Sequence, residues 1–226
     1  MIGLTIDGKA VEAPAGRTIL EVCREKRFYI PTLCFHPALE PHGACRLCMV
    51  EVSQPPRPAR LVAACVTPCE EGMIIETNSE EVQKSRRMTA ELLLAEDDSN
   101  VRLRQIADEL GVTSVRYQTP ERDTCILCGL CVRSCKEIVG VGAISTIYRG
   151  FEKKVSSPFQ IESDICIGCG TCVLVCPTEA IKFSHISGYA RIRQEQRKTV
   201  FLDVEGGTNG KDLVNKAMRY RQLRKK

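Results

Sequence analysis

The sequence predicts an α+β protein built from a small mixed N-terminal domain, a helical connector and a duplicated cysteine-rich domain. Three observations lead to this prediction: apolar residues that alternate at the N-terminus, helix-capping signals in the middle of the chain, and one cysteine spacing that occurs twice in the second half. The expected boundaries are 1–78, 79–118 and 119–187, with a basic extension over 188–226.

Strand signals dominate the first 78 residues. Apolar residues alternate with smaller or polar ones over 2–6, Asp7-Gly8 is a hairpin turn signal, and 10–13 can return as the second strand. Further strands are expected over 47–52, 60–64 and 73–77, with a loop that starts at Gln54.

Capping signals predict three helices. Thr18 and Glu21 form a T-x-x-E capping box for a helix that ends before Pro31. Two further helices are expected in the connector, the first capped by Asn78 or Ser79 and running through Leu94, the second capped by Asn100 and ending at Gly111.

Cysteine content indicates the compartment and the chemistry. The chain has 14 cysteines in 226 residues, and the N-terminal MIGLTIDGKA is typical of a strand rather than of a signal peptide. We therefore expect a cytoplasmic location, where thiols stay reduced and serve metals or catalysis rather than disulfides. No apolar run approaches the roughly 18 residues of a membrane span, so we expect a soluble protein.

Charge is unevenly distributed along the chain. The formal net charge is +4, but residues 189–226 carry 11 Lys or Arg and 4 Asp or Glu, which leaves −3 for residues 1–188. The basic tail favours docking on an acidic partner, with a solvated terminus or contact with anionic lipid as alternatives. Nucleic-acid binding is not expected, because Trp is absent and no basic stretch is interleaved with stacking aromatics.

Two cysteine quartets share the spacing C-x2-C-x2-C-x3-C, which is typical of bacterial ferredoxins with 4Fe-4S clusters. In such proteins the fourth cysteine of each quartet binds the cluster held by the other three-cysteine loop. We therefore expect one 4Fe-4S cluster on Cys125, Cys128, Cys131 and Cys176, and a second on Cys166, Cys169, Cys172 and Cys135.

The residues around the quartets favour iron–sulfur clusters over zinc. Zinc sites usually draw their ligands from two separated pairs, whereas this chain has two triple C-x2-C runs. Gly129, Gly168 and Gly170 are expected to relieve crowding between the backbone and a cluster. Pro177 follows the last cysteine of the second quartet, while Lys136 stands at the equivalent place in the first.

A further set of cysteines lies in the N-terminal domain with the spacing C-x10-C-x2-C-x16-C, which departs from the plant-type ferredoxin pattern in its first loop. The segments IPTLCFHPALEPHGACRLCMVEV and LVAACVTPCEEGMIIET resemble the 2Fe-2S domain of the large iron–sulfur subunit of complex I, the N-termini of iron-only hydrogenases and the diaphorase gamma subunit of NAD-reducing hydrogenase. The resemblance implies a β-grasp fold with one 2Fe-2S cluster on Cys34, Cys45, Cys48 and Cys65. Cys23 and Cys69 are expected to be buried small hydrophobes rather than ligands.

The resemblance extends over roughly residues 1–185 and has one gap. Relatives carry a His and three Cys for an additional 4Fe-4S cluster after ELLLA, and this chain has neither residue type there. After Ile181 only 45 residues without cysteine remain, and we find no catalytic residues to assign. Whether the chain takes part in an enzymatic reaction therefore depends on the partners that it binds.

Two functions fit these observations. The first is an electron-transfer subunit in a soluble hetero-oligomeric oxidoreductase, which connects a flavoprotein that handles NAD(P)H to a second redox subunit. The second redox subunit is of the hydrogenase, formate dehydrogenase or electron-bifurcating type. The alternative is a free-standing polyferredoxin that carries electrons between enzymes.

Overall fold

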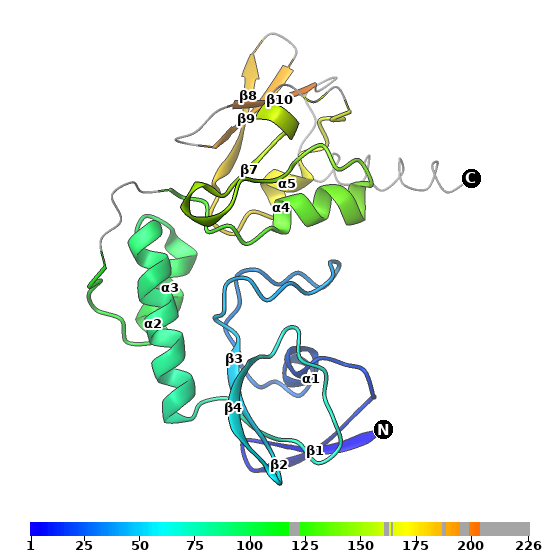
Figure 1. The fold of residues 1–226 in the computed structure, drawn as a ribbon, viewed down its shortest axis with the longest axis vertical. Helices are drawn as coiled ribbons and strands as arrows, with labels where there is room; N and C mark the ends of the chain where they lie inside the picture. The colour runs from blue at the N-terminus through cyan, green and yellow to red at the C-terminus, as the bar shows by residue number, and fades with distance from the viewer. Residues whose placement is uncertain (118–122, 161–162, 164, 187–188, 195–198, 204–226) are drawn as a thin grey trace. The chain divides into compact units, whose positions relative to one another are not determined.

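A computed structural model of the chain describes residues 1–117, 123–160, 163, 165–186, 189–194 and 199–203 (Figure 1). The chain forms two compact units, which are described separately below. The first contains Met1–Phe35 and Pro41–Pro120, and the second contains His36–Glu40 and Glu121–Lys226.

The first unit is built on a five-stranded sheet with the order β2-β1-β5-β3-β4. β1 and β2 form an antiparallel hairpin, β5 joins β1 in parallel, and β3 pairs with both β5 and β4 in antiparallel fashion. The hairpin turn at Asp7-Gly8 was expected from the sequence, and both residues adopt left-handed φ angles of 48° and 76°. The strands are β1 Ile2–Ile6, β2 Lys9–Ala13, β3 Met49–Gln54, β4 Arg57–Ala63 and β5 Ile74–Glu76.

Helix α1, Ile19–Glu25, lies against the sheet and completes the core of the first unit (Figure 1). The predicted capping box is present: the Thr18 hydroxyl accepts from the Glu21 N–H, and the Glu21 carboxylate accepts from the Thr18 N–H at 2.8 Å. The two cysteines expected to be buried, Cys23 and Cys69, both lie in this core.

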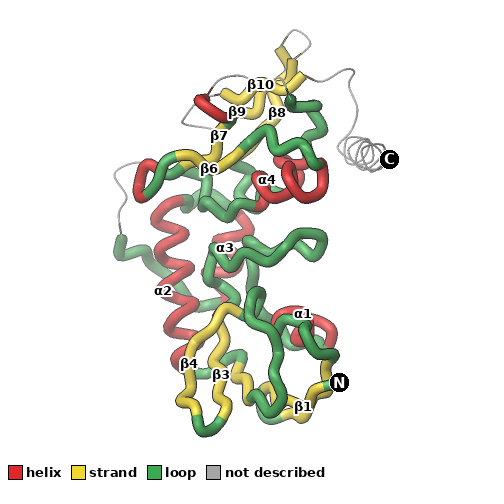
Figure 2. Tube along the Cα trace, turned by 45° about the vertical axis from the view of Figure 1, so that its right-hand side comes forward, coloured by secondary structure: helices red, strands yellow, loops and turns green. Residues whose placement is uncertain are grey.

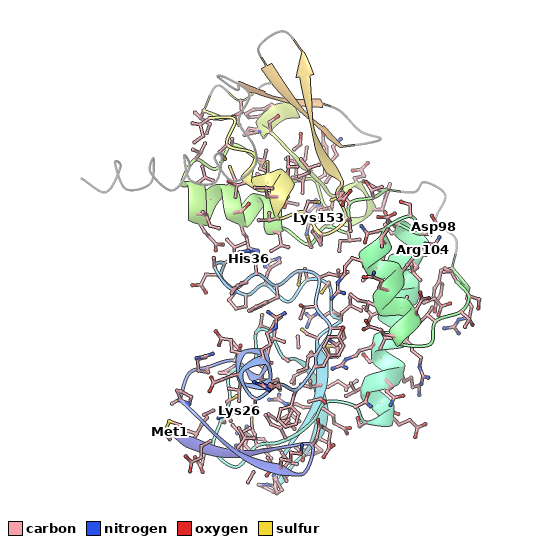
Figure 3. All side chains as sticks on the ribbon, turned by 180° about the vertical axis from the view of Figure 1, so that it is seen from behind. Met1, Lys26, His36, Asp98, Arg104 and Lys153 are labelled. Atoms are coloured by element: carbon pink, nitrogen blue, oxygen red, sulfur yellow. The ribbon has the colours of Figure 1, made fainter. Side chains whose placement is uncertain are left out.

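Two helices follow the sheet and lie side by side in Figures 1 and 2. They are α2, Glu80–Glu96, and α3, Val101–Glu109. Of the two candidate caps for α2, the structure uses Ser79, whose Oγ accepts from the Val82 N–H. In the turn between the helices, the Arg104 guanidinium donates to the Asp98 carbonyl; Figure 3 labels both residues.

The second unit contains the two cysteine quartets, and its two halves differ in helix length. Helix α4, Leu130–Arg133, continues directly into a π-helix, η1, Ser134–Val139, whereas α5 spans only Thr171–Leu174. The residue after the last cysteine explains the difference: proline disfavours helical backbone at the residue before it, so Pro177 stops the second helix before Cys176. Lys136 imposes no such restriction.

Short strands complete the second unit. β6, Ser145–Ile147, pairs with β7, Lys154–Ser156, and β8, Ile181–Ile186, pairs with β9, Tyr189–Gln194, which in turn pairs with β10, Thr199–Asp203. The sheet β8-β9-β10 therefore continues beyond residue 187, where the sequence analysis placed a domain boundary. Most of the basic extension expected over 188–226 lies outside the described residues.

The segment His36–Glu40 also belongs to the second unit. The Glu40 N–H donates to Glu137 Oε2 at 2.9 Å, and the Arg133 guanidinium donates to the Glu40 carbonyl. Both partners lie on the continuous α4–η1 helix, so this segment is held to the helix that carries Cys135.

Candidate metal centres

The first candidate centre consists of the four N-terminal cysteines predicted as ligands, and it lies entirely in the first unit. β3 begins directly after Cys48 and β4 ends just before Cys65, and the Ala64 N–H donates to the Cys48 carbonyl at 3.0 Å. The antiparallel hairpin therefore brings these two cysteines together. All four side chains are buried, with exposed fractions of 5% or less: Cys34, Cys45, Cys48 and Cys65.

The four thiols of the first centre contact one another. The Cys45 N–H donates to Cys34 Sγ at 3.4 Å, and hydrogen bonds from the thiols of Cys45 and Cys65 hold the pKa of Cys34 far below its usual value. A hydrogen bond from Cys65 likewise lowers the pKa of Cys48. The donor thiols show the opposite effect, because the same hydrogen bonds raise the pKa of Cys45 and Cys65. The hairpin and the 34–45 loop thus gather four sulfur atoms in one buried place.

The second centre is indicated by the neighbours of Cys131, which is 6% exposed. Burial is the main cause that raises the pKa of Cys131, and negative charge on Cys128, Cys125 and Cys176 adds to it. Those three residues are the other members of the set predicted from the exchange of fourth ligands. The fourth cysteine of the second quartet therefore lies within electrostatic range of the first quartet's loop.

The third centre shows the reciprocal arrangement. Burial raises the pKa of Cys172 well above its usual value, with further contributions from Cys169, Cys131, Cys166 and Cys135. Burial also raises the pKa of Cys166 to about 11, and charge on Cys135 adds to that shift. The two groups are adjacent, because Cys131 and Cys172 share one apolar cluster with Ile144, Val155 and Ile181.

Left-handed backbone shapes both loops of the second unit. Gly129, Gly168 and Gly170 have φ angles of 72°, 63° and 69°. Leu127, which occupies the place of Gly168 in the first loop, also has a positive φ of 51°. The two loops therefore have the same left-handed backbone at this position, although one has leucine where the other has glycine. A left-handed non-glycine residue costs about 1–2 kcal/mol.

Hydrogen-bond donors face several of the thiols. The Ala143 N–H donates to Cys135 Sγ at 3.3 Å. Hydroxyl groups lie next to two further sulfur atoms, Thr171 Oγ1 at 3.3 Å from Cys169 and Thr178 Oγ1 at 3.7 Å from Cys176. Donors of this kind stabilise thiolates and adjust the potential of a bound cluster.

The donor sets fit iron–sulfur clusters. Each centre offers thiols that are buried or half-buried, and the backbone beside them adopts conformations that leave room for a bulky group. Within the described residues, no group of three or more His, Cys, Asp or Glu side chains is placed to hold a metal ion by itself.

Cys23 and Cys69, expected from the sequence to be buried small hydrophobes, are 0% and 6% exposed. Burial raises their pKa values to about 12 and about 11. Sequence reasoning missed Arg86, which is 4% exposed and donates to the carbonyl of Met49, the residue after Cys48. A signal was available, because Val82, Arg86 and Ala90 recur every four residues on the apolar side of a helix, where an arginine is unusual.

Comparisons with known proteins agree with this organisation. Residues 1–80 match the family described as "2Fe-2S iron-sulfur cluster binding domain", and residues 124–183 match the "4Fe-4S dicluster domain". A subunit of the NADH-quinone oxidoreductase of Rickettsia bellii is 29% identical, over 90% of this chain and 33% of its own length. NADP-reducing hydrogenase subunit HndD of Solidesulfovibrio fructosivorans is 32% identical, over 80% of this chain and 36% of its own length.

A solved structure gives the deciding similarity. A chain of the NAD+-reducing [NiFe]-hydrogenase in the H2-reduced state superposes with a TM-score of 0.61 and 30% identity, over 69% of this chain and 74% of that chain. This protein belongs to the iron–sulfur subunit family shared by complex I and NAD-reducing hydrogenases. Both of its domain matches are described as iron–sulfur cluster domains. The predicted resemblance is thereby confirmed.

The curated family members are longer proteins. This chain spans about a third of the length of the curated relatives described above. A helix with the length and apolarity needed to cross a membrane does not occur among the described residues.

Proposed function

We propose that this chain is the electron-transfer subunit of a multi-subunit oxidoreductase and passes single electrons between a flavoprotein that handles NAD(P)H and a second redox subunit. It would act in the cytoplasm and contain one 2Fe-2S and two 4Fe-4S clusters. The relatives are named as subunits of NADH-quinone oxidoreductase and of hydrogenases, which supports a hetero-oligomer with a nicotinamide-linked reaction.

The observation that carries the proposal is the grouping of the thiols. Four N-terminal thiols contact one another, and each three-cysteine loop of the second unit has the other quartet's fourth cysteine among its close neighbours. This grouping supports three four-thiol ligand sets. They are Cys34, Cys45, Cys48 and Cys65; Cys125, Cys128, Cys131 and Cys176; and Cys135, Cys166, Cys169 and Cys172.

When bound, such clusters accept and release single electrons at potentials between about −700 and +450 mV. The chain's own residues hold the sulfur ligands in place and exclude water. Cys48 and Cys65 lie in the core of the first unit, and Ile144, Val155 and Ile181 pack around the second and third centres. Burial of this kind limits reorganisation of solvent when charge moves.

The sheet order and the helices support the finer domain assignment. A central parallel pair, β1 and β5, flanked by antiparallel strands on both sides, supports a β-grasp domain. α2 and α3 support a helical connector over 79–118 that lacks the additional cluster motif.

Native purification under anaerobic conditions tests this function. We expect the chain to co-purify with a flavin-containing subunit, and we expect NADH or NADPH to reduce its clusters in that complex. The isolated chain should not be reduced by either nucleotide, because the step from a hydride to single electrons needs the flavin that the proposal places on the partner. Recovery of the chain from its source as a lone monomer with all clusters intact would instead favour a free-standing carrier.

A further inference from the structure

Arg86 links the buried side of α2 to the first centre. Its guanidinium donates twice to the Met49 carbonyl, from Nε at 3.0 Å and from Nη2 at 2.7 Å. Met49 follows the ligand Cys48 directly, so the guanidinium is bound to the peptide next to a candidate cluster ligand. At 4% exposure, Arg86 is largely shielded from water.

The charge of Arg86 has no nearby carboxylate to balance it. Among residues that the structure describes, none of the Asp or Glu side chains lies within ion-pair distance of its guanidinium. Asp7 acts on it only at longer range, and that carboxylate accepts hydrogen bonds from the Thr77 N–H at 2.6 Å and the Thr77 hydroxyl at 2.7 Å. A guanidinium stays protonated in proteins, so a full positive charge is buried here.

Burial of an unbalanced charge is costly unless an opposite charge lies close by. Burial lowers the pKa of Arg86, and negative charge on Cys48 opposes this shift more than that of Tyr29, Asp7 or Cys23. Because Arg86 is bound to the peptide directly after Cys48, a cluster on Cys48 would place negative charge close to this cation. An oxidised cluster with four thiolates carries a net charge of about −2.

We propose that Arg86 tunes the first centre, raising its reduction potential by stabilising the reduced state electrostatically. The inference rests on the proposed 2Fe-2S cluster at Cys34, Cys45, Cys48 and Cys65. Reduction adds one electron from the reductant, breaks no bond and moves no proton, so the negative charge near Arg86 increases by one unit. A buried cation favours that increase more strongly than an exposed one, because water screens the interaction less.

A purely structural role for Arg86 makes a different prediction. Its two hydrogen bonds join α2 to β3, so loss of the side chain would lower stability even if the charge had no effect on the cluster. Stability therefore does not distinguish the two roles, whereas the midpoint potential does. Arg86 is a positioning residue of the redox centre and not a ligand.

The test is an anaerobic redox titration of the full chain, followed by electron paramagnetic resonance of the reduced 2Fe-2S cluster. Arg86→Gln removes the charge and should lower the equilibrium constant for reduction about tenfold, a fall of about 59 mV for one electron. Arg86→Lys keeps the charge and should restore most of the potential. Arg87→Gln is the matched control: Arg87 is exposed on the same helix, and its loss should change the constant less than about twofold.

A second variant keeps the test valid if Arg86→Gln loses its cluster. Arg86→citrulline, introduced by nonsense suppression, removes the charge and keeps the shape with donors at Nε and one terminal nitrogen, so both bonds to Met49 can form. It should show the same tenfold fall. An unchanged potential in a cluster-loaded neutral variant would refute the tuning role. Absence of any 2Fe-2S signal from the unmodified chain would instead refute the cluster assignment on which this inference rests.

Discussion

At the scale of single residues, Cys135 is the most informative of the proposed ligands. It is sequential with the first quartet, but it contributes charge to Cys166 and Cys172 of the second. We predict that Cys135→Ala disrupts the cluster of the second loop and lowers the iron content from about ten to about six per chain. Spectra of the reduced variant should match those of Cys166→Ala.

Two comparisons make this prediction specific. If Cys135 served its own loop, the surviving signal of Cys135→Ala would match that of Cys125→Ala instead. Cys69→Ala is the control, because Cys69 is buried in the core without a predicted ligand role. Its iron content should stay at the value of the unmodified chain.

The candidate ligand sets could be proposed from the sequence because cysteine spacing is a local property. Arg86 could not be recognised in the same way, since its role depends on a contact between residues 37 positions apart. The sequence does place Arg86 among apolar positions of α2, but only the tertiary structure shows that it reaches the Met49 carbonyl. The backbone of Leu127 could not be predicted either, because leucine does not favour the left-handed conformation that it adopts here.

At the scale of helices and strands, the start of α2 depends on one hydroxyl. Ser79 Oγ accepts from the Val82 N–H and donates to Glu51 Oε2 at 2.5 Å, which also ties the helix to β3. We predict that Ser79→Ala lowers the free energy of unfolding by about 1–2 kcal/mol. Anaerobic thermal unfolding should show a fall of about 2–4 °C for each kcal/mol in a chain of this size.

Asn78 supplies a matched control for the cap. It is the neighbouring residue that the sequence offered as an alternative, it is exposed, and its backbone carbonyl, not its side chain, accepts from Gln83. Asn78→Ala should change the stability by no more than about 0.5 kcal/mol. Equal losses in the two variants would contradict the assignment of Ser79 as the cap.

The continuous α4–η1 helix leads to a second prediction at this scale. Lys136→Pro introduces the proline of the second quartet into a helix interior, where its ring clashes with the preceding turn. We predict a loss of about 3 kcal/mol or more, measured by thermal unfolding. Lys136→Ala should be neutral within about 0.5 kcal/mol, since the side chain is exposed. A stable Lys136→Pro variant would show that the helix can end before Cys135, as α5 ends before Cys176.

Helix starts and the first hairpin were predicted closely, because capping boxes and turn dipeptides act within a few residues. Thr18, Ser79 and Asn100 all cap helices as expected. Strand ends were less accurate: β3 and β4 extend to Gln54 and Arg57, so the expected loop is a tight turn. The π-helix that contains Cys135 had no sequence signal beyond the missing proline.

At the scale of the whole molecule, the chain combines an acidic body with a basic tail. Residues 1–188 have a net charge of −3 before any cluster is bound, and three clusters at about −2 each would make them more negative. The tail could not be placed from the sequence, and most of it lies outside the described residues. The net charge of +4 therefore gives little information about how the loaded protein meets its partners.

The central claim is that twelve thiols hold three clusters, and analysis of iron, acid-labile sulfide and zinc in the anaerobically purified chain tests it most directly. We predict about ten iron and ten sulfide per chain, with negligible zinc. About eight of each would remove the first centre. Stoichiometric zinc with no sulfide would contradict the account as a whole.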